Sequence, residues 1–352
     1  MLPKIAVIIV TYNSTSYIDE VLLSLERVDY PKEKLEIIVV DNASKDGTPE
    51  ILRSKEGITF FSSGENLGFA AGNNLGINHA LLDSVEYVYL LNPDAKMDQQ
   101  ALREVVALAE KDENVGSVQS RMMLWKHPKV LNSTGGMVHF LGFGFVRDNG
   151  REWEDVREKI QDGEEIAYAS GAAVLYRASA LRKVGLLDPY YFMYHEDLEL
   201  GWRLRLAGYK NVLATKSVVY HDYEFSRSIK KFYWMERNRV IVHCSHLKWK
   251  TLLLLGPLMT LMELALFAFA LKGGWIKEKV LVCVDLMRPG TWKHIMKKRR
   301  ESTLIRAVPD KEIVRLFTGS ISHQETNNPV VERIANPALT VVWIILKSII
   351  RW

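Results

Sequence analysis

The sequence is poor in cysteine, with Cys244 and Cys283 as the only two among 352 residues. They do not form a C-x-x-C pair, so the pattern indicates neither a disulfide framework nor a zinc cage, and a reducing compartment fits. The net charge is only +4 and no base-reading motif is present, which argues against a nucleic-acid partner. The apolar run at residues 5–10 is too short for the core of a signal peptide, so we expect no cleaved export signal.

Length and composition indicate a folded chain with one large domain and an appendage. Hydrophobic residues make up 48% of the chain and charged residues 25%, which is typical of a globular protein. The hydropathy changes at about residue 245. We therefore place a first domain at residues 1–245, with halves at about 1–115 and 116–245, and a helical region at residues 246–352.

Short apolar runs alternate with amphipathic stretches in the first domain. Strands are expected at residues 5–10, 35–40, 58–61, 87–91 and 172–176, and helices at residues 17–28, 48–54, 70–82, 99–111 and 197–207. Continuous apolar strands are typical of a parallel sheet that is covered on both faces. The alternation predicts an α/β doubly wound fold, in which ligands bind at the carboxyl ends of the strands.

Polar clusters follow three of these expected strands. Thr11, Tyr12 and Asn13 come after the first, Asp41 after the second, and Asp94 after the fourth. A carboxylate in such a place accepts hydrogen bonds from a base or a ribose, or binds a divalent cation between two phosphates. Each aspartate taken singly is also a common turn former or helix cap; their shared position after strands favours the functional interpretation.

Glycines gather at residues 135–150, with Phe140, Phe143 and Phe145 among them. Two interpretations stay open for this segment. It is either a loop that faces an acceptor molecule or an ordinary hairpin connection.

Five strings occur in an order that resembles the family 2 glycosyltransferases of the GT-A fold, most closely the rhamnosyltransferase-like branch. They are VTYN, VVDNASKDGT, ENLGFAAGNNLGI, LLNPDA and HEDLELGWRLRLAGY, and the resemblance covers about residues 3–240. It implies a mostly parallel sheet flanked by helices. It also implies two sets of residues that bind the nucleotide sugar: Thr11, Tyr12, Asn13, Asp41 and Asn42 for the nucleotide, and Asn66, Gly68, Phe69 and Asn73 on a segment that closes over the donor. The alternative interpretation of that segment is a loop made flexible by glycine, followed by the start of a helix.

The metal motif of the family is usually Asp-x-Asp, and here Asn92 holds the first position. Asn92 is therefore expected to contact the nucleotide sugar, and Asp94 is the charged ligand for Mg²⁺ or Mn²⁺. The resemblance implies His221 as a second ligand, 24 residues beyond Asp197. A lone histidine at the end of a strand is otherwise a structural residue.

The His195-Glu196-Asp197 cluster is expected to carry the catalysis. By resemblance Asp197 is the base that removes a proton from the acceptor hydroxyl, and Glu196 shapes the site or binds the acceptor. The alternative for the two acids is a helix N-terminus favoured by the helix dipole. The remaining candidates are Trp202 and Arg203 on the acceptor side and Arg227 near the diphosphate. The alternative for Arg227, which the sequence favours, is an ordinary surface arginine.

The region after residue 245 suggests attachment to a membrane. Residues 252–271 are long enough to cross a bilayer, although Glu263 and Pro257 weaken that case. Residues 275–287 have an amphipathic pattern and residues 339–352 are again apolar, while residues 297–300 form a basic run that is either solvated or bound to anionic lipid. We expect helices that lie in one leaflet; a single span or a buried helix pair is the alternative.

The expected function is inverting transfer of a sugar, such as rhamnose, from a nucleoside-diphosphate sugar to a lipid-linked or polysaccharide acceptor. The expected place is the cytoplasmic face of the cell membrane, in a peripheral or monotopic mode, and a homo-oligomer stays open. The alternative is a catalytically silent, membrane-docked protein of the same fold that binds the sugar or nucleotide. A nucleotidyltransferase is disfavoured because no triphosphate-binding glycine loop is present.

Overall fold

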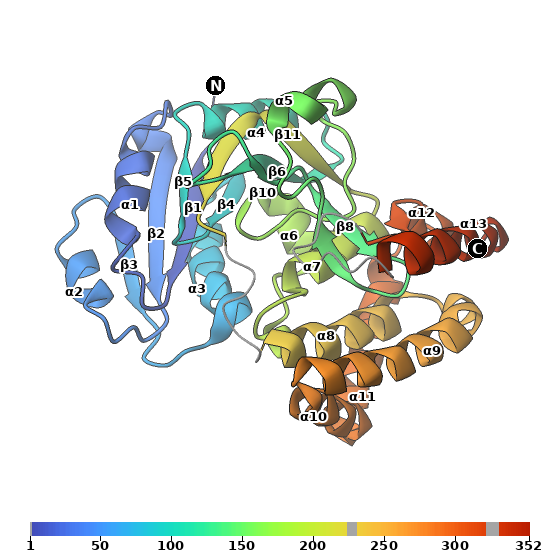
Figure 1. Ribbon diagram of the computed structural model, residues 1–352. Coiled ribbons are helices and arrows are strands. Elements are labelled where there is room, and N and C mark those ends of the chain that lie inside the picture. The colour runs from blue at the N-terminus through green and yellow to red at the C-terminus, as the bar shows by residue number, and fades with distance from the viewer. Residues whose placement is uncertain (1, 224–230, 322–330) are drawn as a thin grey trace. The chain divides into compact units, whose positions relative to one another are not determined.

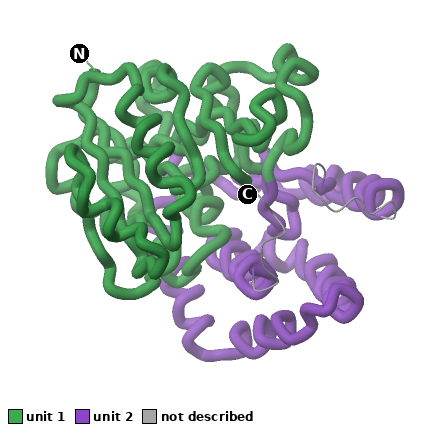
Figure 2. Tube along the Cα trace, turned by 60° about the vertical axis from the view of Figure 1, so that its left-hand side comes forward, with its two compact units in different colours: residues 1–136, 146–204, 209–223 green, residues 137–145, 205–208, 224–352 purple. Residues whose placement is uncertain are grey.

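The computed structural model describes residues 2–223, 231–321 and 331–352. The chain forms two compact units, shown in different colours in Figure 2. Unit 1 comprises residues 1–136, 146–204 and 209–223, and unit 2 comprises residues 137–145, 205–208 and 224–352. The chain thus enters unit 2 twice before it stays there.

Unit 1 is built on a nine-stranded sheet whose strands follow the order β3-β2-β1-β4-β10-β6-β11-β5, with β7 paired to β6. The strands are β1 (Ile5–Thr11), β2 (Leu35–Asp41), β3 (Thr59–Ser62), β4 (Tyr87–Leu91), β5 (Ala95–Met97), β6 (Val115–Leu124), β7 (Leu131–Ser133), β10 (Ala173–Arg177) and β11 (Lys210–His221). The first four are parallel to one another, whereas β10 runs antiparallel between β4 and β6. The α/β class is confirmed, and the second half of the sheet is mixed.

The helices of unit 1 connect these strands (Figure 1). They are α1 (Ile18–Glu26), α2 (Thr48–Arg53), α3 (Gly68–Leu82), α4 (Ala101–Ala109), α5 (Trp153–Val156), α6 (Ala178–Val184) and α7 (Glu196–Leu206). Strands β1 and β4 are buried along almost their whole length, as their continuous apolar sequences require. Helix α3 packs closely against β1. A Cβ atom on Gly76 would lie only 2.7 Å from Cγ2 of Ile8, so a larger residue at this position would clash.

Unit 2 is mainly helical and carries a small three-stranded sheet with the order β12-β8-β9. Its elements are β8 (Gly136–His139), β9 (Gly144–Val146), α8 (Lys231–His246), α9 (Trp249–Gly273), α10 (Ile276–Met287), α11 (Pro289–Ile305), α12 (Asp310–Val314), β12 (Phe317–Thr318) and α13 (Asn336–Ile349). The glycine-rich segment thus contains the β8–β9 hairpin. Phe140 and Phe145 of this segment are buried, and Phe140 stacks on Trp343 with ring centroids 5.0 Å apart.

A network of four charged side chains joins α8, α9 and α10 inside unit 2. Nζ of Lys279 lies 2.9 Å from Glu236 and 2.6 Å from Glu263, and Arg239 contacts the same two carboxylates. Arg239 and Lys279 are fully buried. Glu263, near the middle of the long apolar helix α9, is therefore held against two neighbouring helices.

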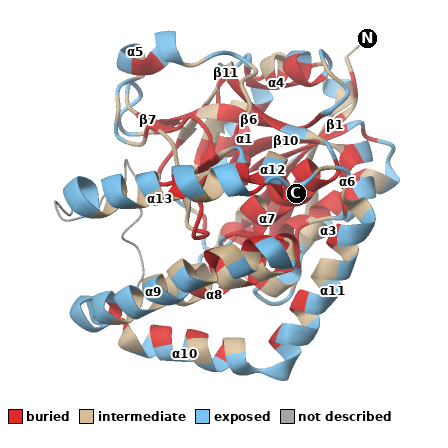
Figure 3. Ribbon diagram, turned by 90° about the vertical axis from the view of Figure 1, so that its right-hand side faces the viewer, coloured by how far each residue is buried: buried red, intermediate tan, exposed pale blue. Residues whose placement is uncertain are grey.

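Helix α9 is otherwise little buried, as Figure 3 shows. Only Thr251, Leu255 and Ala270 of its residues are buried. Within the described residues, α9 is the one helix with the length and composition of a membrane span. It is not the buried core helix that the sequence left as an alternative.

Candidate active site

The loops after β1 and β2 are tied together at the carboxyl edge of the sheet. Asp41 is buried, and its carboxylate accepts hydrogen bonds from the hydroxyl of Thr11 at 3.0 Å and from the main-chain N–H of Ser44 at 3.0 Å. Asn13 accepts a bond from the N–H of Lys45 at 2.8 Å. Tyr12, which follows Thr11 directly, is half-exposed. Four of the predicted nucleotide-binding residues are thus brought together; Asp41 organises the loop as well.

The predicted donor segment lies beside the fifth of these residues, Asn42. Its side-chain amide donates to the carbonyl of Gly68 at 2.9 Å. Asn66 accepts a bond from the N–H of Gly68 at 2.9 Å, and Asn73 donates to the carbonyl of Phe69 at 2.9 Å. Asn66 precedes α3, and Gly68 and Phe69 lie in its first turn. The helix-start interpretation therefore fits this structure.

The pairing of β11 with β5 brings His221 to Asp94. His221 lies opposite Ala95 in the register of these two strands. Its Nε2 atom is 3.2 Å from Oδ1 of Asp94 and 3.4 Å from the side-chain amide nitrogen of Asn92. Three candidates that are up to 129 residues apart in the chain therefore meet at one point.

The other nitrogen of His221 is also engaged. Nδ1 lies 3.0 Å from Oδ1 of Asn132. When Nδ1–H donates to that oxygen, the lone pair of the neutral ring is on Nε2, which faces Asp94. A carboxylate and an imidazole lone pair at this distance attract each other only through a cation or a proton between them, so the residues present fit a divalent cation.

The strand end that carries His221 is fixed by its neighbour, Asp222. The carboxylate of Asp222 accepts a hydrogen bond from the hydroxyl of Tyr17 at 2.7 Å and pairs with Nζ of Lys126 at 2.9 Å. Its main-chain N–H donates to the carbonyl of Asp94 at 2.9 Å. These contacts hold the two candidate ligands in register before any cation binds.

Asp197 lies in the first turn of α7 and is held by main-chain donors. The N–H of Gly171 donates to Oδ2 at 3.0 Å, and the N–H of Leu198 donates to Oδ1 at 2.7 Å. Burial raises the pKa of Asp197 above its ordinary value, and the two N–H groups oppose that rise. Burial and the Asp197 carboxylate raise the pKa of the adjacent Glu196 well above its ordinary value. Two neighbouring acids thus have different surroundings, as a site with separate acid and base roles requires.

The candidate base lies beside the strand end that leads to the candidate cation ligands. Gly171, which donates to Asp197, is followed by Ala172, whose carbonyl accepts a bond from the N–H of Asn92 at 2.9 Å. Two successive residues therefore bridge α7 and the end of β4. The candidate ligands and the candidate base are parts of one site in unit 1.

Trp202 and Arg203 are not brought to an open acceptor surface. Both are buried. The guanidinium of Arg203 pairs with Glu199 at 2.7 Å and donates to the carbonyls of Val184, Gly185 and Leu186 at 2.6, 3.0 and 2.6 Å. In this structure Arg203 holds α7 to the end of α6. Arg227 lies outside the described residues.

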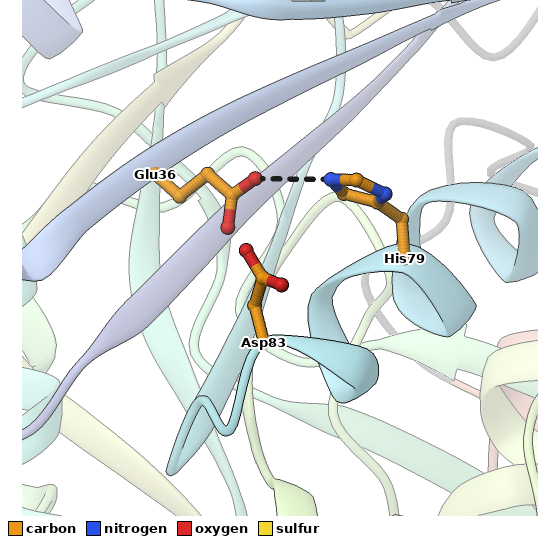
Figure 4. A group of neighbouring side chains, drawn as sticks. All are labelled: Glu36, His79 and Asp83. Atoms are coloured by element: carbon orange, nitrogen blue, oxygen red, sulfur yellow. Dashed lines mark ion pairs between the residues drawn. The ribbon is translucent and has the colours of Figure 1, made fainter.

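A second group of possible ligands lies elsewhere in unit 1. Glu36, His79 and Asp83 offer ligand atoms within 4.8 Å of one another, and His79 pairs with Glu36 at 3.3 Å (Figure 4). Glu36 belongs to the beginning of β2 and Asp83 follows α3, so the group lies at the amino end of the strand. It is separate from the carboxyl edge, where the order of motifs predicts the chemistry.

A family model described as "Glycosyl transferase family 2" matches residues 6–185, just over half of the chain. The chain belongs to this family. The match includes the loops after β1, β2 and β4 together with α3, and it ends before the cluster of Glu196 and Asp197. The resemblance found in the sequence is therefore confirmed at the level of the family.

Two curated relatives are similar to more than half of the chain. The low-salt glycan biosynthesis hexosyltransferase Agl10 of Haloferax volcanii is 26% identical over 215 residues, which cover 58% of this chain and 62% of that protein. The N-acetylglucosaminyl-diphospho-decaprenol L-rhamnosyltransferase of Mycobacterium tuberculosis is 26% identical over 248 residues, which cover 63% of this chain and 76% of that protein. The chain thus spans less than two thirds of the first relative.

A solved structure extends the similarity to most of the chain. The mannosyltransferase PcManGT from Pyrobaculum calidifontis, in complex with GDP-Man and Mn²⁺, has a TM-score of 0.52 and 21% sequence identity. The similarity covers 86% of this chain and 87% of that one. The GT-A fold expected from the motifs is confirmed.

The sequence analysis did not find two residues that contact the candidate site residues. Asn132, which binds His221, lies 89 residues away from it in β7. Gly171, which binds Asp197, directly precedes the expected strand at residues 172–176. A glycine at such a place is a common mark of close backbone approach, and it was the one available clue.

Proposed function

We propose that this protein is an inverting glycosyltransferase that uses a nucleoside-diphosphate sugar and a divalent cation. One observation carries the proposal: the Gly171 N–H holds the Asp197 carboxylate in the same site where Asp94 and His221 converge. Membership in glycosyl transferase family 2 and the GT-A fold support it.

Asp94 and His221 would hold the cation, which stabilises negative charge on the leaving diphosphate when it is bound. Asp197 would accept the proton of the acceptor hydroxyl as that oxygen attacks the anomeric carbon from the face opposite the diphosphate. Its raised pKa makes it a stronger base than an ordinary aspartate. The two main-chain N–H groups keep one carboxylate orientation, so the base need not reorient during the reaction.

Glu196 would have a different role, because folding favours its protonated form. A protonated carboxyl group has an O–H donor as well as an acceptor oxygen. It is 5% exposed and adjacent to the base, so we assign it to the shaping of the acceptor side.

The donor and acceptor are proposed from the relatives. The mycobacterial relative is named for transfer of L-rhamnose to a lipid-linked acceptor, and the haloarchaeal one for glycan biosynthesis. A rhamnosyl donor with a lipid-linked or growing glycan acceptor is therefore the first candidate. The proposed place of the site is the cytoplasmic face of the membrane.

The exposed face of α9 supports attachment to a membrane. Its exposed residues from Leu253 to Leu271 recur every three or four positions and include no charged residue: Leu253, Pro257, Thr260, Leu261, Leu264, Ala265, Ala268, Phe269 and Leu271. This stripe is about 28 Å long at 1.5 Å per residue. Lys250 precedes the stripe and Lys272 follows it. Monomeric soluble proteins rarely expose so much contiguous apolar surface.

The charged network argues that α9 lies in the leaflet and does not cross the bilayer. A crossing helix would carry Glu263, and with it the buried Arg239 and Lys279, toward the hydrocarbon centre. Several charges at that depth are costly. An interfacial helix keeps the network in the protein and presents only the apolar stripe to lipid.

Flotation with vesicles of phosphatidylglycerol and phosphatidylcholine tests this attachment. The wild-type protein is expected to float with the vesicles and to be released by alkaline carbonate. Leu261→Asp with Leu264→Asp is expected to abolish flotation, whereas Leu82→Asp, at an isolated exposed leucine of unit 1, is expected to leave it unchanged. A stripe covered by a second copy would instead give a dimer without vesicles and no flotation.

The activity is tested with a panel of UDP-, GDP- and dTDP-sugars, including dTDP-rhamnose, in the presence of Mn²⁺ or Mg²⁺. Binding of the right donor at 100 times its Kd stabilises the folded state by about 2.7 kcal/mol, which a thermal shift detects. Donor hydrolysis and transfer to a polyprenyl-diphosphate sugar are then measured. If no donor shifts the melting temperature or turns over, the proposal fails.

Asp197→Asn separates a transferase from a silent binding protein. The substitution is nearly isosteric and removes the base, so transfer is expected to fall by about 10²–10⁴-fold. Donor binding and thermal stability are expected to persist. Equal, residual turnover in the wild type and in Asp197→Asn would favour the binding protein.

A further inference from the structure

The segment before the catalytic helix has an uncommon backbone. Phe192, Tyr194 and His195 have φ values of 61°, 65° and 70°, although none is glycine. At Phe192 ψ is −62°, and the N–H of Met193 donates to the carbonyl of Tyr191 at 2.7 Å. This is a γ-turn of the positive-φ kind, which is rare and strained. Residues with such backbone angles persist only where their surroundings hold them.

The surroundings of Phe192 are the donor segment at the start of α3. The carbonyl of Phe192 accepts bonds from the N–H groups of Phe69 at 2.8 Å and Ala70 at 3.3 Å, which the first turn of a helix leaves without partners of its own. The ring of Phe192 lies directly against Gly68. A Cβ atom on Gly68 would lie 2.5 Å from both Cδ2 and the carbonyl oxygen of Phe192.

A second contact leads from the same segment to the base. A Cβ atom on Gly171 would lie 2.8 Å from Cζ of Phe69 and 3.6 Å from Cβ of Asp197. The Phe69 ring therefore packs over Gly171, whose N–H binds the Asp197 carboxylate. The donor segment thus reaches Asp197 by two routes: along the chain from residue 192 to 197, and through the Phe69 ring and Gly171.

We propose that Phe192 is a positioning residue that couples the donor segment of α3 to the placement of Asp197. The coupling rests on the proposed function insofar as Asp197 is the base. The ring of Phe192 packs against Gly68 and keeps the strained turn in place. The carbonyl of Phe192 fixes the N-terminus of α3, from which Phe69 reaches Gly171. A movement of the donor segment therefore shifts Asp197, and a movement of Asp197 shifts the donor segment.

Phe192→Gly tests the coupling because glycine adopts the observed φ without strain and removes only the ring. Ser84→Gly is the matched control, because Ser84 is exposed and also has a positive φ, of 57°. It precedes β4 and so lies at the amino end of that strand, whereas the candidate site lies at the carboxyl end. Phe192→Leu retains an apolar side chain and serves if the glycine variant does not fold.

The first measurement is amide-resolved hydrogen exchange without any ligand. The amides of Phe69 and Gly171 donate to Phe192 and Asp197, and both are expected to exchange at least about tenfold faster in Phe192→Gly. Ser84→Gly is expected to leave both unchanged. Unchanged exchange at Gly171 in both Phe192 variants would overturn the coupling. This measurement needs no substrate, so it decides the coupling even where the nucleotide-sugar panel refutes the transferase.

The second measurement is the kinetics of transfer with the donor that the panel yields. A base displaced by about 1 Å costs on the order of 10²-fold, so kcat is expected to fall toward that extent while the donor KM changes less. A merely structural Phe192 would lower the melting temperature and leave kcat unchanged in the folded fraction. That result would also overturn the proposal.

Discussion

Arg203→Met provides a direct measure of what the buried arginine of α7 does. In the structure Arg203 is almost completely buried, forms two hydrogen bonds with Glu199 and donates to three carbonyls. Methionine fills part of the volume and removes the charge. Glu199, whose side chain is fully buried, would then lose this ion pair.

The expected loss of stability follows from this geometry. Removal of one partner of a buried ion pair typically destabilises a protein by about 3–5 kcal/mol, because the other charge is left uncompensated. The abandoned carbonyls add to that loss. We therefore expect the free energy of unfolding to fall by about 4 kcal/mol, which lowers the melting temperature by roughly 8–16 °C for a unit of this size.

Urea denaturation and thermal melting of the full chain measure the effect. The matched control is Arg53→Met, which removes an exposed pair with Glu50 and is expected to cost less than about 1 kcal/mol. The reasoning is refuted if Arg203→Met is as stable as Arg53→Met. If Arg203→Met also raised the KM for the acceptor but not the KM for the donor, Arg203 would belong to the acceptor surface that the sequence suggested.

Three further outcomes are expected. Asn132→Leu removes the partner of His221 and should weaken Mn²⁺ binding about 10–100-fold by calorimetry; unchanged affinity would exclude His221 as an oriented ligand. Folding raises the pKa of Glu196 above 4.5, so the wild-type free energy of unfolding should fall as pH rises above that value, and less steeply in Glu196→Gln; parallel urea-denaturation curves would contradict this. Gly68→Ala, with φ +76° and Phe192 in the way, should destabilise by at least about 1 kcal/mol more than Gly57→Ala, with φ +74° and open space; equal melting shifts would contradict the contact.

The strands of the first half followed from local chemistry. Apolar, β-branched runs predicted β1, β2 and β4 to within about one residue, because such runs are soluble only when both faces of a sheet are covered. The polar residues after them then fall at one edge of the sheet without any knowledge of tertiary contacts. Asp41 and Asp94 were found in this way.

Residue order alone did not show how the second half of the sheet is arranged. Strand β10 enters antiparallel between β4 and β6, and β11 pairs with β5. Pairing between strands depends on side chains distant in the chain, so no local pattern encodes it. The approach of His221 to Asp94 and the role of Asn132 follow from this pairing.

For charged residues too, the sequence showed the position and only the structure showed the partners. The sequence identified Arg203 and Glu263 as polar residues in informative places, but it did not reveal their partners. Arg203 is neutralised by Glu199 within its own helix, and Glu263 by Arg239 and Lys279 from two other helices. Whether a charge faces water, a substrate or a buried partner depends on packing.

The sequence by itself determined the family, the α/β class, the edge of the sheet where the candidate site lies and the apolar character of the region after residue 245, because periodicity and motif order are properties of the chain. The tertiary structure alone decided which atoms meet. It placed Nε2 of His221 against Asp94, the N–H of Gly171 against Asp197 and Glu263 inside a charged network. Such contacts join residues that are tens of positions apart, and only the folded chain brings them together.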